Sequence, residues 1–180
     1  MRRAVVLLLL CGCATPKVED GARAVFDLTA TPSDTSTAWG LGLYGYRTNH
    51  RVGMHFNLQA TIEHREEYDF VGNPFGDPVV GEERDLWAFN VGPTLLLMDT
   101  ATVDWGLFAG LGYGGVTTYD VLDDPTGILN GPDGVYHAKR DEEAGVNFNV
   151  GSHLLINRAA LGASYSTQLE AVSFHVGVAF

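Results

Sequence analysis

Three residues have side chains of the types used in nucleophilic catalysis. Ser173 and His175 lie two positions apart, and Asp27 lies near the start of the chain. A serine nucleophile, a histidine base and a carboxylate that orients the histidine are the usual set for acyl transfer. They can meet only if the fold joins the first and last segments. We expect instead that His175, with His153 and His55, is a hydrogen-bonded interior residue and that the protein is not an enzyme.

Carboxylates gather in two other stretches, where they could bind divalent cations, since calcium takes roughly six to eight oxygen ligands. The first stretch holds Glu66, Glu67, Asp69, Asp77, Glu82 and Glu83, and the second holds Asp120, Asp123, Asp124, Asp133, Asp141, Glu142 and Glu143. No EF-hand spacing is present, so we expect solvated loop surfaces, with no metal and no cofactor. The aromatic residues among these acids suit recognition of a surface ligand; they are Tyr68, Phe70, Phe75 and Tyr136.

Composition limits the classes of protein that could carry these residues. The chain has 180 residues, 22 glycines, 46% hydrophobic residues and a formal net charge of −11. This length fits one domain, the hydrophobic fraction excludes disorder, and the acidity argues against nucleic acid. The longest apolar run after residue 20 is Leu95 to Met98, whereas a membrane helix needs about 18 residues. An α-helical membrane protein is therefore excluded, and a soluble β domain or a β-barrel remains.

The first residues have the pattern of an export signal. Arg2 and Arg3 precede an apolar stretch that ends at Cys11. The sequence Leu10-Cys11-Gly12-Cys13 resembles a bacterial lipobox, which implies lipidation of Cys13. The alternative is ordinary signal-peptidase cleavage after Ala14. We therefore divide the chain into a signal peptide with lipobox (1–13), a linker (14–21) and a barrel domain (22–180).

The rest of the chain alternates apolar and polar residues with the period of β-strands. The alternation is strongest from Val52 to Glu63, where every second side chain is apolar. Eight segments carry the pattern: Ala24–Ala30, Ala38–Arg47, Val52–Glu63, Asp85–Met98, Val103–Tyr119, Ala144–Gly151, Ala159–Ser166 and Val172–Phe180. No segment has helical periodicity.

The connections alternate between short turns and longer loops, as in outer-membrane barrels. The short turns are Thr48–Arg51, Asp99–Thr102 and Asn157–Arg158. The connections at the opposite end are Thr31–Thr37, His64–Arg84, Asp120–Glu143 and the short Thr167–Glu170. Both long loops therefore lie at one end, which predicts an eight-stranded antiparallel up-and-down transmembrane β-barrel.

The polar face of the strands is rich in glycine and poor in lysine and arginine, which predicts that it lines a narrow, filled lumen. The apolar face of the same strands, with Trp39, Trp87 and Trp105 near the strand ends, is then expected to contact lipid. A soluble, lipid-anchored barrel that binds an apolar ligand would need the opposite orientation. Pro93 lies inside a predicted strand and cannot donate a ladder hydrogen bond, so we expect a bulge there.

The C-terminal segment ends in Phe180 with apolar residues at every second position back to Val172, and resembles the assembly signal of Gram-negative outer-membrane barrels. Residues 22–180 resemble the small OmpA/OmpX-type barrel class. This resemblance implies an outer-membrane location and contact with membrane lipid, lipopolysaccharide and the outer-membrane assembly machinery. We expect a structural or surface-interaction protein with an unknown surface ligand, and no open pore. A lipid A-modifying enzyme of similar size is the alternative, although the His-x-Ser pairing of those enzymes is absent.

Overall fold

The computed structural model describes residues 22–47, 51–62, 67–100, 102–127 and 134–180. Its strands are β1 (Ala22–Pro32), β2 (Thr37–Arg47), β3 (Val52–Thr61), β4 (Glu67–Val71), β5 (Val79–Asp99), β6 (Val103–Asp123), β7 (Val135–Ile156), β8 (Ala159–Ser166) and β9 (Ala171–Ala179). Among the described residues, no helix is long and apolar enough to cross a membrane. The predicted lipidation site, Cys13, lies outside the described residues.

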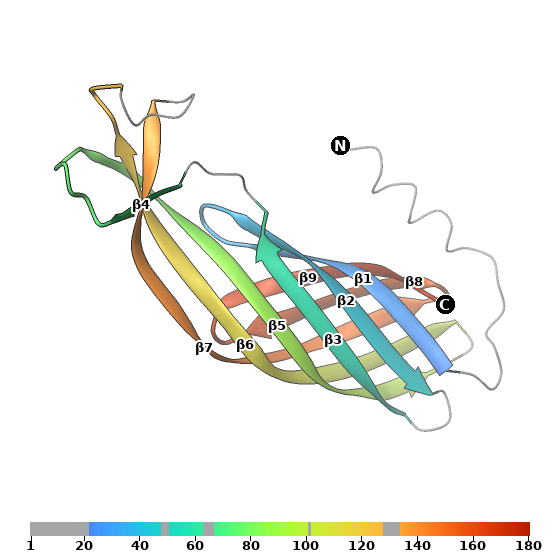
Figure 1. Cartoon of the computed structure of the whole chain (residues 1–180). Helices are drawn as coiled ribbons and strands as arrows, with labels where there is room; N and C mark the ends of the chain where they lie inside the picture. The colour runs from blue at the N-terminus through green and yellow to red at the C-terminus, as the bar shows by residue number, and fades with distance from the viewer. Residues whose placement is uncertain (1–21, 48–50, 63–66, 101, 128–133) are drawn as a thin grey trace.

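Eight of these strands close into a ring in the order β1-β2-β3-β5-β6-β7-β8-β9, and β9 pairs with β1. Every neighbouring pair in the ring is antiparallel. The tilted strands form a barrel that is longer on one side (Figure 1). The prediction of an eight-stranded antiparallel barrel is therefore confirmed, and closure brings the first and last strands side by side.

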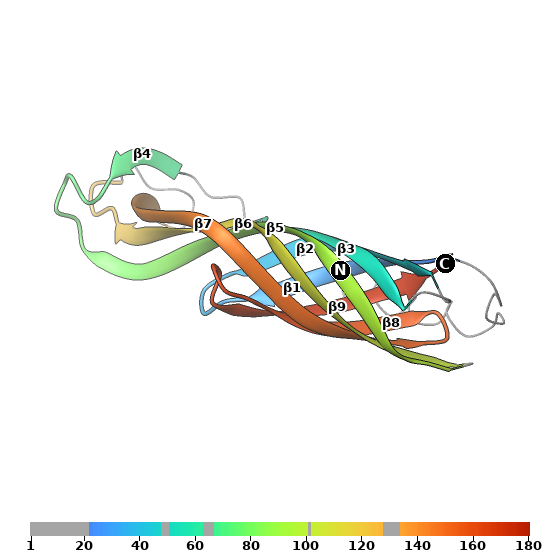
Figure 2. The same ribbon diagram turned by 90° about the horizontal axis from the view of Figure 1, so that it is seen from below.

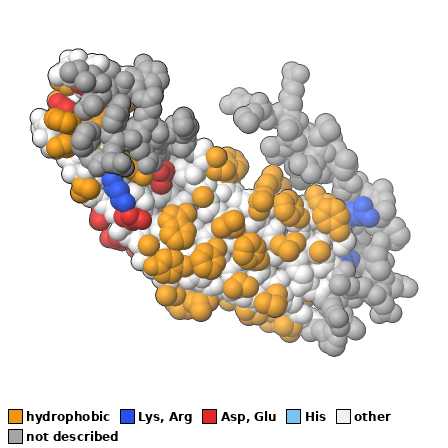
Figure 3. Space-filling view, in the orientation of Figure 1, with side chains coloured by type: hydrophobic (Ala, Val, Ile, Leu, Met, Phe, Trp, Pro, Cys, Tyr) orange, Lys and Arg blue, Asp and Glu red, His pale blue; other side chains and the backbone are white. Residues whose placement is uncertain are grey.

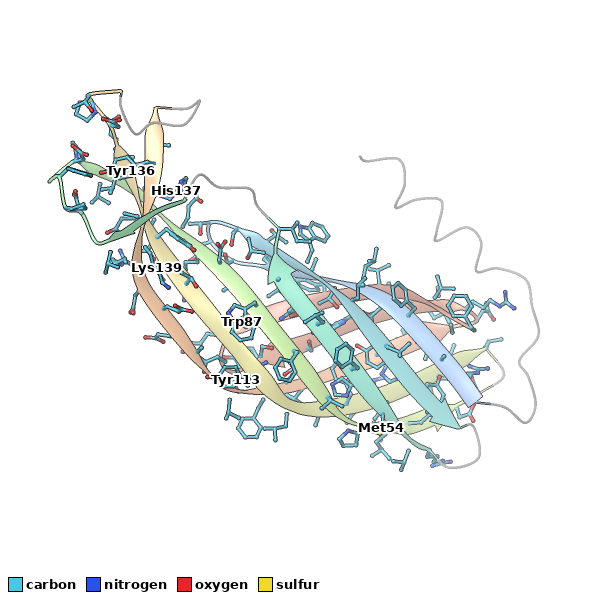
Figure 4. The ribbon with its side chains drawn as sticks, in the orientation of Figure 1. Met54, Trp87, Tyr113, Tyr136, His137 and Lys139 are labelled. Atoms are coloured by element: carbon cyan, nitrogen blue, oxygen red, sulfur yellow. The ribbon has the colours of Figure 1, made fainter. Side chains whose placement is uncertain are left out.

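The orientation of the side chains follows from the alternation along each strand. On β3, Phe56 is 44% exposed and Asn57 is 3% exposed, although the two residues are neighbours. The outward residues form a continuous apolar belt around the visible face of the barrel (Figure 3). Trp39 and Trp105 are exposed at opposite ends of this belt, while Trp87 is half-buried beside Tyr113 (Figure 4). The predicted orientation, apolar outward and polar inward, is the one observed.

Inward-facing glycines make room for large side chains from neighbouring strands. A Cβ atom at Gly106 would lie 2.6 Å from the His153 ring, and one at Gly110 would lie 2.8 Å from Nε2 of His55. Both distances are shorter than real Cβ contacts allow, so larger residues there must displace an imidazole. The inward-facing glycines at positions 106 and 110 therefore leave space that the rings of His153 and His55 occupy.

Strands β5, β6 and β7 continue beyond the barrel at its longer end, and β4 pairs in parallel with β7 there. We call this four-stranded region, with the segment 72–78, the outer extension; Figure 2 shows it projecting from the barrel. The prediction of loops over His64–Arg84 and Asp120–Glu143 is therefore wrong in part. Residues 79–84, 120–123 and 135–143 are paired strand, because β-hairpin pairing continues past the belt.

The prediction of a bulge at Pro93 is also wrong. Pro93 pairs with Met54 in a register that runs unbroken from Val52 to Ala60 on β3. The register shift near the turn end of β5 lies instead between Leu96 and Met98. On the side of β6, Gly92 and Pro93 have no partners, but the register is the same before and after them. The missing donor of proline therefore interrupts the pairing without producing a bulge.

Candidate functional site

His175 is the centre of a buried hydrogen-bond network in the middle of the barrel. Its Nε2 atom lies 2.9 Å from Oγ of Ser164. Its Nδ1 atom lies 3.2 Å from Oγ1 of Thr29, 3.3 Å from the hydroxyl of Tyr44 and 3.4 Å from Oδ1 of Asp27. All five side chains are buried. Because β1 and β9 are paired, Asp27 and His175 are close together, as a catalytic arrangement of these residues would require.

Ser173, by contrast, does not contact His175. Its hydroxyl lies 2.6 Å from Oγ1 of Thr31 and 3.4 Å from Oε1 of Gln59, nearer the loop end of the lumen. Two residues that alternate along one strand lie about 7 Å apart, too far for a hydrogen bond. The serine that reaches His175 comes from β8, where Gly162 is the direct partner of His175. The alternation along β8 places the side chain of Ser164 inside the barrel. Which residue of β9 it meets depends on the register between the two strands, which alternation alone does not determine.

The other two predicted interior histidines are buried, but they pack differently. The ring of His55 lies 4.7 Å from that of Phe108, and the ring of His153 lies 5.2 Å from that of Tyr44, measured between centroids. Within the described residues, neither imidazole has a hydrogen bond of normal geometry. The expectation of hydrogen-bonded histidines is therefore met at His175, whereas His55 and His153 pack mainly against aromatic rings.

Two apolar clusters lie inside the barrel. One, on the side of the short turns, contains Val25, Tyr44, Tyr46, Leu96, Phe108, Leu155, Ala160 and Ala179. The other, on the side of the outer extension, contains Ala38, Leu86, Ala88, Val116 and Leu169. An ion pair between Arg23 and the buried Asp104, which also accepts a hydrogen bond from Tyr46, accompanies the first cluster. The interior thus combines a polar network with apolar packing.

The outer extension has a small core of its own. Leu122, Tyr136 and Ala138 are fully buried there. The hydroxyl of Tyr136 donates a 2.8 Å hydrogen bond to Oδ2 of Asp77, in the segment that returns from β4 to β5. Burial and this hydrogen bond raise the pKa of Tyr136 to about 12. The extension is therefore a packed structure.

Charged groups on the extension pair with one another. The guanidinium of Arg140 contacts Glu82 and Asp120 at 2.6 and 2.9 Å, and the bond to Glu82 is the main reason that its pKa is raised. Nε2 of His137 lies 3.3 Å from a carboxylate oxygen of Glu83 (Figure 4). No group of three His, Cys, Asp or Glu side chains within the described residues could hold a metal ion. Some of the acidic residues on the surface of the extension are therefore paired with basic side chains.

Some candidate cation-binding and recognition residues lie outside what the structure describes. They are Glu66, Asp133 and the side chains of Glu67, Tyr68, Asp69 and Phe70. Of the other aromatic residues, Tyr136 is in the core and Phe75 is exposed. Phe180 is also exposed, and its backbone NH donates a 2.8 Å hydrogen bond to the carbonyl of Ala24 on β1. The predicted assembly signal is therefore accessible at the seam where β9 meets β1.

The hydrogen bond between Tyr136 and Asp77 can be tested by alkaline titration. We expect the difference in phenolate absorbance between wild type and Tyr136→Phe to show a midpoint near pH 12. Because the folded state favours the neutral phenol, its stabilising effect is present below pH 10 and is lost as the pH rises through 12. A midpoint near the ordinary value of 10 would show that this phenol is neither buried nor held by Asp77.

Comparisons with known proteins give distant structural likenesses. No protein-family model matches the chain, and no curated protein matches it. The crystal structure of Ail, the attachment invasion locus protein of Yersinia pestis, in complex with the heparin analogue sucrose octasulfate, aligns over 89% of this chain and 97% of its own, with 13% identity and a TM-score of 0.42. Neisserial surface protein A aligns over 88% of this chain and 92% of its own, with 9% identity and a TM-score of 0.39.

A structure of Ail in a phospholipid nanodisc gives 14% identity and a TM-score of 0.42 over 89% of this chain and 99% of its own. At these identities and scores, nothing about the ligands or roles of those proteins transfers to this chain. The architecture itself is that of the small eight-stranded barrels of the Gram-negative outer membrane: eight antiparallel strands, short turns at one end and long strands at the other.

Proposed function

We propose that the protein is an integral outer-membrane protein in which the barrel is a closed anchor and the outer extension is a contact surface. The observation that carries this proposal is the orientation of β3 and its neighbours. Leu41, Phe56 and Val91 are exposed on three adjacent strands, while Asn57, Gln59 and Asn90 are buried. Water would disfavour that arrangement, whereas a bilayer favours it.

The barrel acts as an anchor and not as a pore. An eight-stranded barrel has an interior just wide enough for side chains. Aromatic rings from Tyr44 and Phe108 pack against each other across it, 5.2 Å apart. The second cluster, which includes Leu86 and Leu169, adds apolar side chains on the other side. Solutes would have to displace both sets of side chains.

A soluble barrel that binds an apolar ligand is the less favoured alternative. Such a protein needs an apolar cavity, whereas Asn57, Asn147 and Asn149 are among the buried residues here. The amide of Asn57 donates to Thr29, and that of Asn147 donates to Asn90 and Ser166. An apolar ligand inside the barrel would break these hydrogen bonds without replacing them.

An enzymatic role for Ser164, His175 and Asp27 is also less favoured, although their hydrogen bonds follow the order of a catalytic triad. Each of the three side chains is at most 4% exposed. A lipid or acyl substrate has no room beside a serine in so narrow an interior. We propose that this network stabilises the joint between β1, β8 and β9.

A fluorophosphonate probe tests the absence of catalysis. We expect the folded protein in detergent to remain unlabelled while a serine hydrolase in the same tube is labelled, because Ser164 is buried. The matched variants are Ser164→Ala and His175→Asn. Labelling of the wild type that both variants abolish would replace the structural role with an enzymatic one.

Fractionation of a Gram-negative host that expresses the full chain tests the anchor. We expect wild type and Cys13→Ser to stay in the outer-membrane fraction after an alkaline wash and to be released by detergent, because the barrel has its own apolar belt. A fatty-acid label should mark the wild type alone. Absence of label from both would favour cleavage after Ala14, whereas release of Cys13→Ser without detergent would contradict the integral barrel.

The proposed partners follow from this location. Lipid and lipopolysaccharide would meet the apolar belt, and the assembly machinery would read the C-terminal strand that ends at the exposed Phe180. A surface ligand would meet the outer extension. The acidic chain disfavours nucleic acid.

A further inference from the structure

The outermost part of the extension has apolar side chains that are largely exposed. Val71, Phe75 and Val80 are 84%, 57% and 59% exposed. Val79 and the prolines of the same segment are exposed beside them. We call this set the tip patch: Val71, Pro74, Phe75, Pro78, Val79 and Val80. Its residues lie within the ten positions from Val71 to Val80, at the end of β4, in the connection to β5 and at the start of β5. The apolar belt covers the barrel, from which the extension projects (Figure 3).

The segment that carries Phe75 is held in one conformation. The side chain of Asn73 donates a 2.6 Å hydrogen bond to the carbonyl of Asp77 and accepts one of 3.0 Å from its backbone NH. Gly72 and Gly76 have positive φ angles of 77° and 74°, which let the chain turn before and after Phe75. Tyr136 anchors the same segment through Asp77. An apolar group held outward in this way loses little conformational entropy on binding.

Acidic residues predominate around the tip patch, although Lys139 is the strand partner of Val71. The acids there are Asp77, Asp123 and Asp124, and residues 71–81, 121–127 and 134–136 contain no lysine or arginine. The nearest cations on β7 are already paired, Lys139 with Glu142 and Arg140 with Glu82 and Asp120. The patch is therefore apolar with an anionic border.

The negative charge around the tip patch favours some binding partners over others. An anionic lipid surface or a sulfated polysaccharide would be repelled, and so would a second copy of a chain whose net charge is −11. A protein surface with an apolar site bordered by lysine or arginine complements both features. We propose that the tip patch docks such a protein, with Phe75 as the central anchor. This inference rests on the proposed role of the extension as the contact surface.

Selection from a random dodecapeptide phage library against the protein in nanodiscs tests the proposal, with empty nanodiscs as the counter-selection. We expect enriched peptides to combine aromatic or aliphatic residues with lysine or arginine. A synthetic peptide from the selection should bind about tenfold more weakly to Phe75→Ser and to Val80→Ser, because each change removes part of the apolar contact. Asp123→Lys should also weaken binding, and added salt should weaken binding to the wild type.

The control is Ile62→Ser, which changes an exposed apolar residue just after the end of β3 and should leave binding unchanged. Enrichment without basic residues, equal binding to the tip variants, or no enrichment over empty nanodiscs would overturn the proposal. So would a Phe75-dependent association with anionic vesicles or between nanodisc-bound copies. Insertion into nanodiscs with a β-sheet circular dichroism spectrum is measured first, so that a failure of the barrel anchor is distinguished from a failure of the docking site.

Discussion

Replacing Phe56 by arginine will weaken folding into lipid vesicles by about 2 to 4 kcal/mol, measured by denaturant titration. Phe56 lies in the middle of β3 and is 44% exposed on the outer face. In the bilayer this exposed area is in contact with hydrocarbon, where a guanidinium loses its hydration. The inward neighbours His55 and Asn57 are on the opposite face and cannot reach around the strand to pair with it.

Phe56→Leu is the matched control. We expect it to cost less than about 1 kcal/mol, because lipid chains adjust to the smaller side chain and no cavity remains. Wild-type folding in buffer without detergent or lipid, together with a marked loss of stability in the leucine variant, would contradict the membrane assignment. Asn57→Arg is not a matched control, because Asn57 is buried and hydrogen-bonded to Thr29.

The barrel could be predicted because lipid on one face and the barrel interior on the other impose the same period of two on every strand. Strand β3 illustrates this, because its apolar residues face outward and the polar residues His55, Asn57 and Gln59 face inward. The alternation of short and long connections then fixed which ends lie together. These two signals are local in sequence, so they needed no knowledge of register.

The outer extension could not be predicted in this way. Residues 79–84 and 135–143 are rich in charge and are strands because they continue the ladders of β5, β6 and β7. Beyond the bilayer, water lies on both sides of the sheet and the apolar alternation is no longer required. The short β4 pairs in parallel with β7 after a long connection, which no local pattern specifies.

The lumen network was predicted only in part for a similar reason. Asp27, Ser173 and His175 were the residues that the sequence analysis considered together, and Ser164 was not among them. The shear of the closed barrel decides which inward-facing residues meet. The pairing of Gly162 with His175 brings Ser164 to that imidazole and sends Ser173 toward Thr31. A one-residue difference in register would have changed these partners, and the sequence contains no signal strong enough to fix it.

Replacing Gly110 by leucine will destabilise the barrel by about 1 to 3 kcal/mol, and by more if the strands cannot adjust. A Cβ atom there lies 2.8 Å from Nε2 of His55 and 3.3 Å from Cβ of Asn90. His55 is itself packed on Phe108, so it has no alternative position without further movement. The free energy of unfolding in detergent or lipid vesicles measures the loss. Unchanged stability would mean that the lumen is open enough to admit a leucine.

Because the obstacle at Gly110 is mainly a side chain, it can be removed. His55→Ala alone should destabilise by leaving a cavity beside Phe108, yet combined with Gly110→Leu it should restore part of the stability lost in each single variant. The coupling free energy should be about 0.5 to 3 kcal/mol in the favourable direction. Gly112 is the matched control, since a Cβ atom there would collide with the backbone carbonyl of Phe89. Gly112→Ala should therefore be destabilising whether or not His55 is present. If the losses for Gly110→Leu and His55→Ala were additive, β3 and β6 would not pack against each other through these two residues.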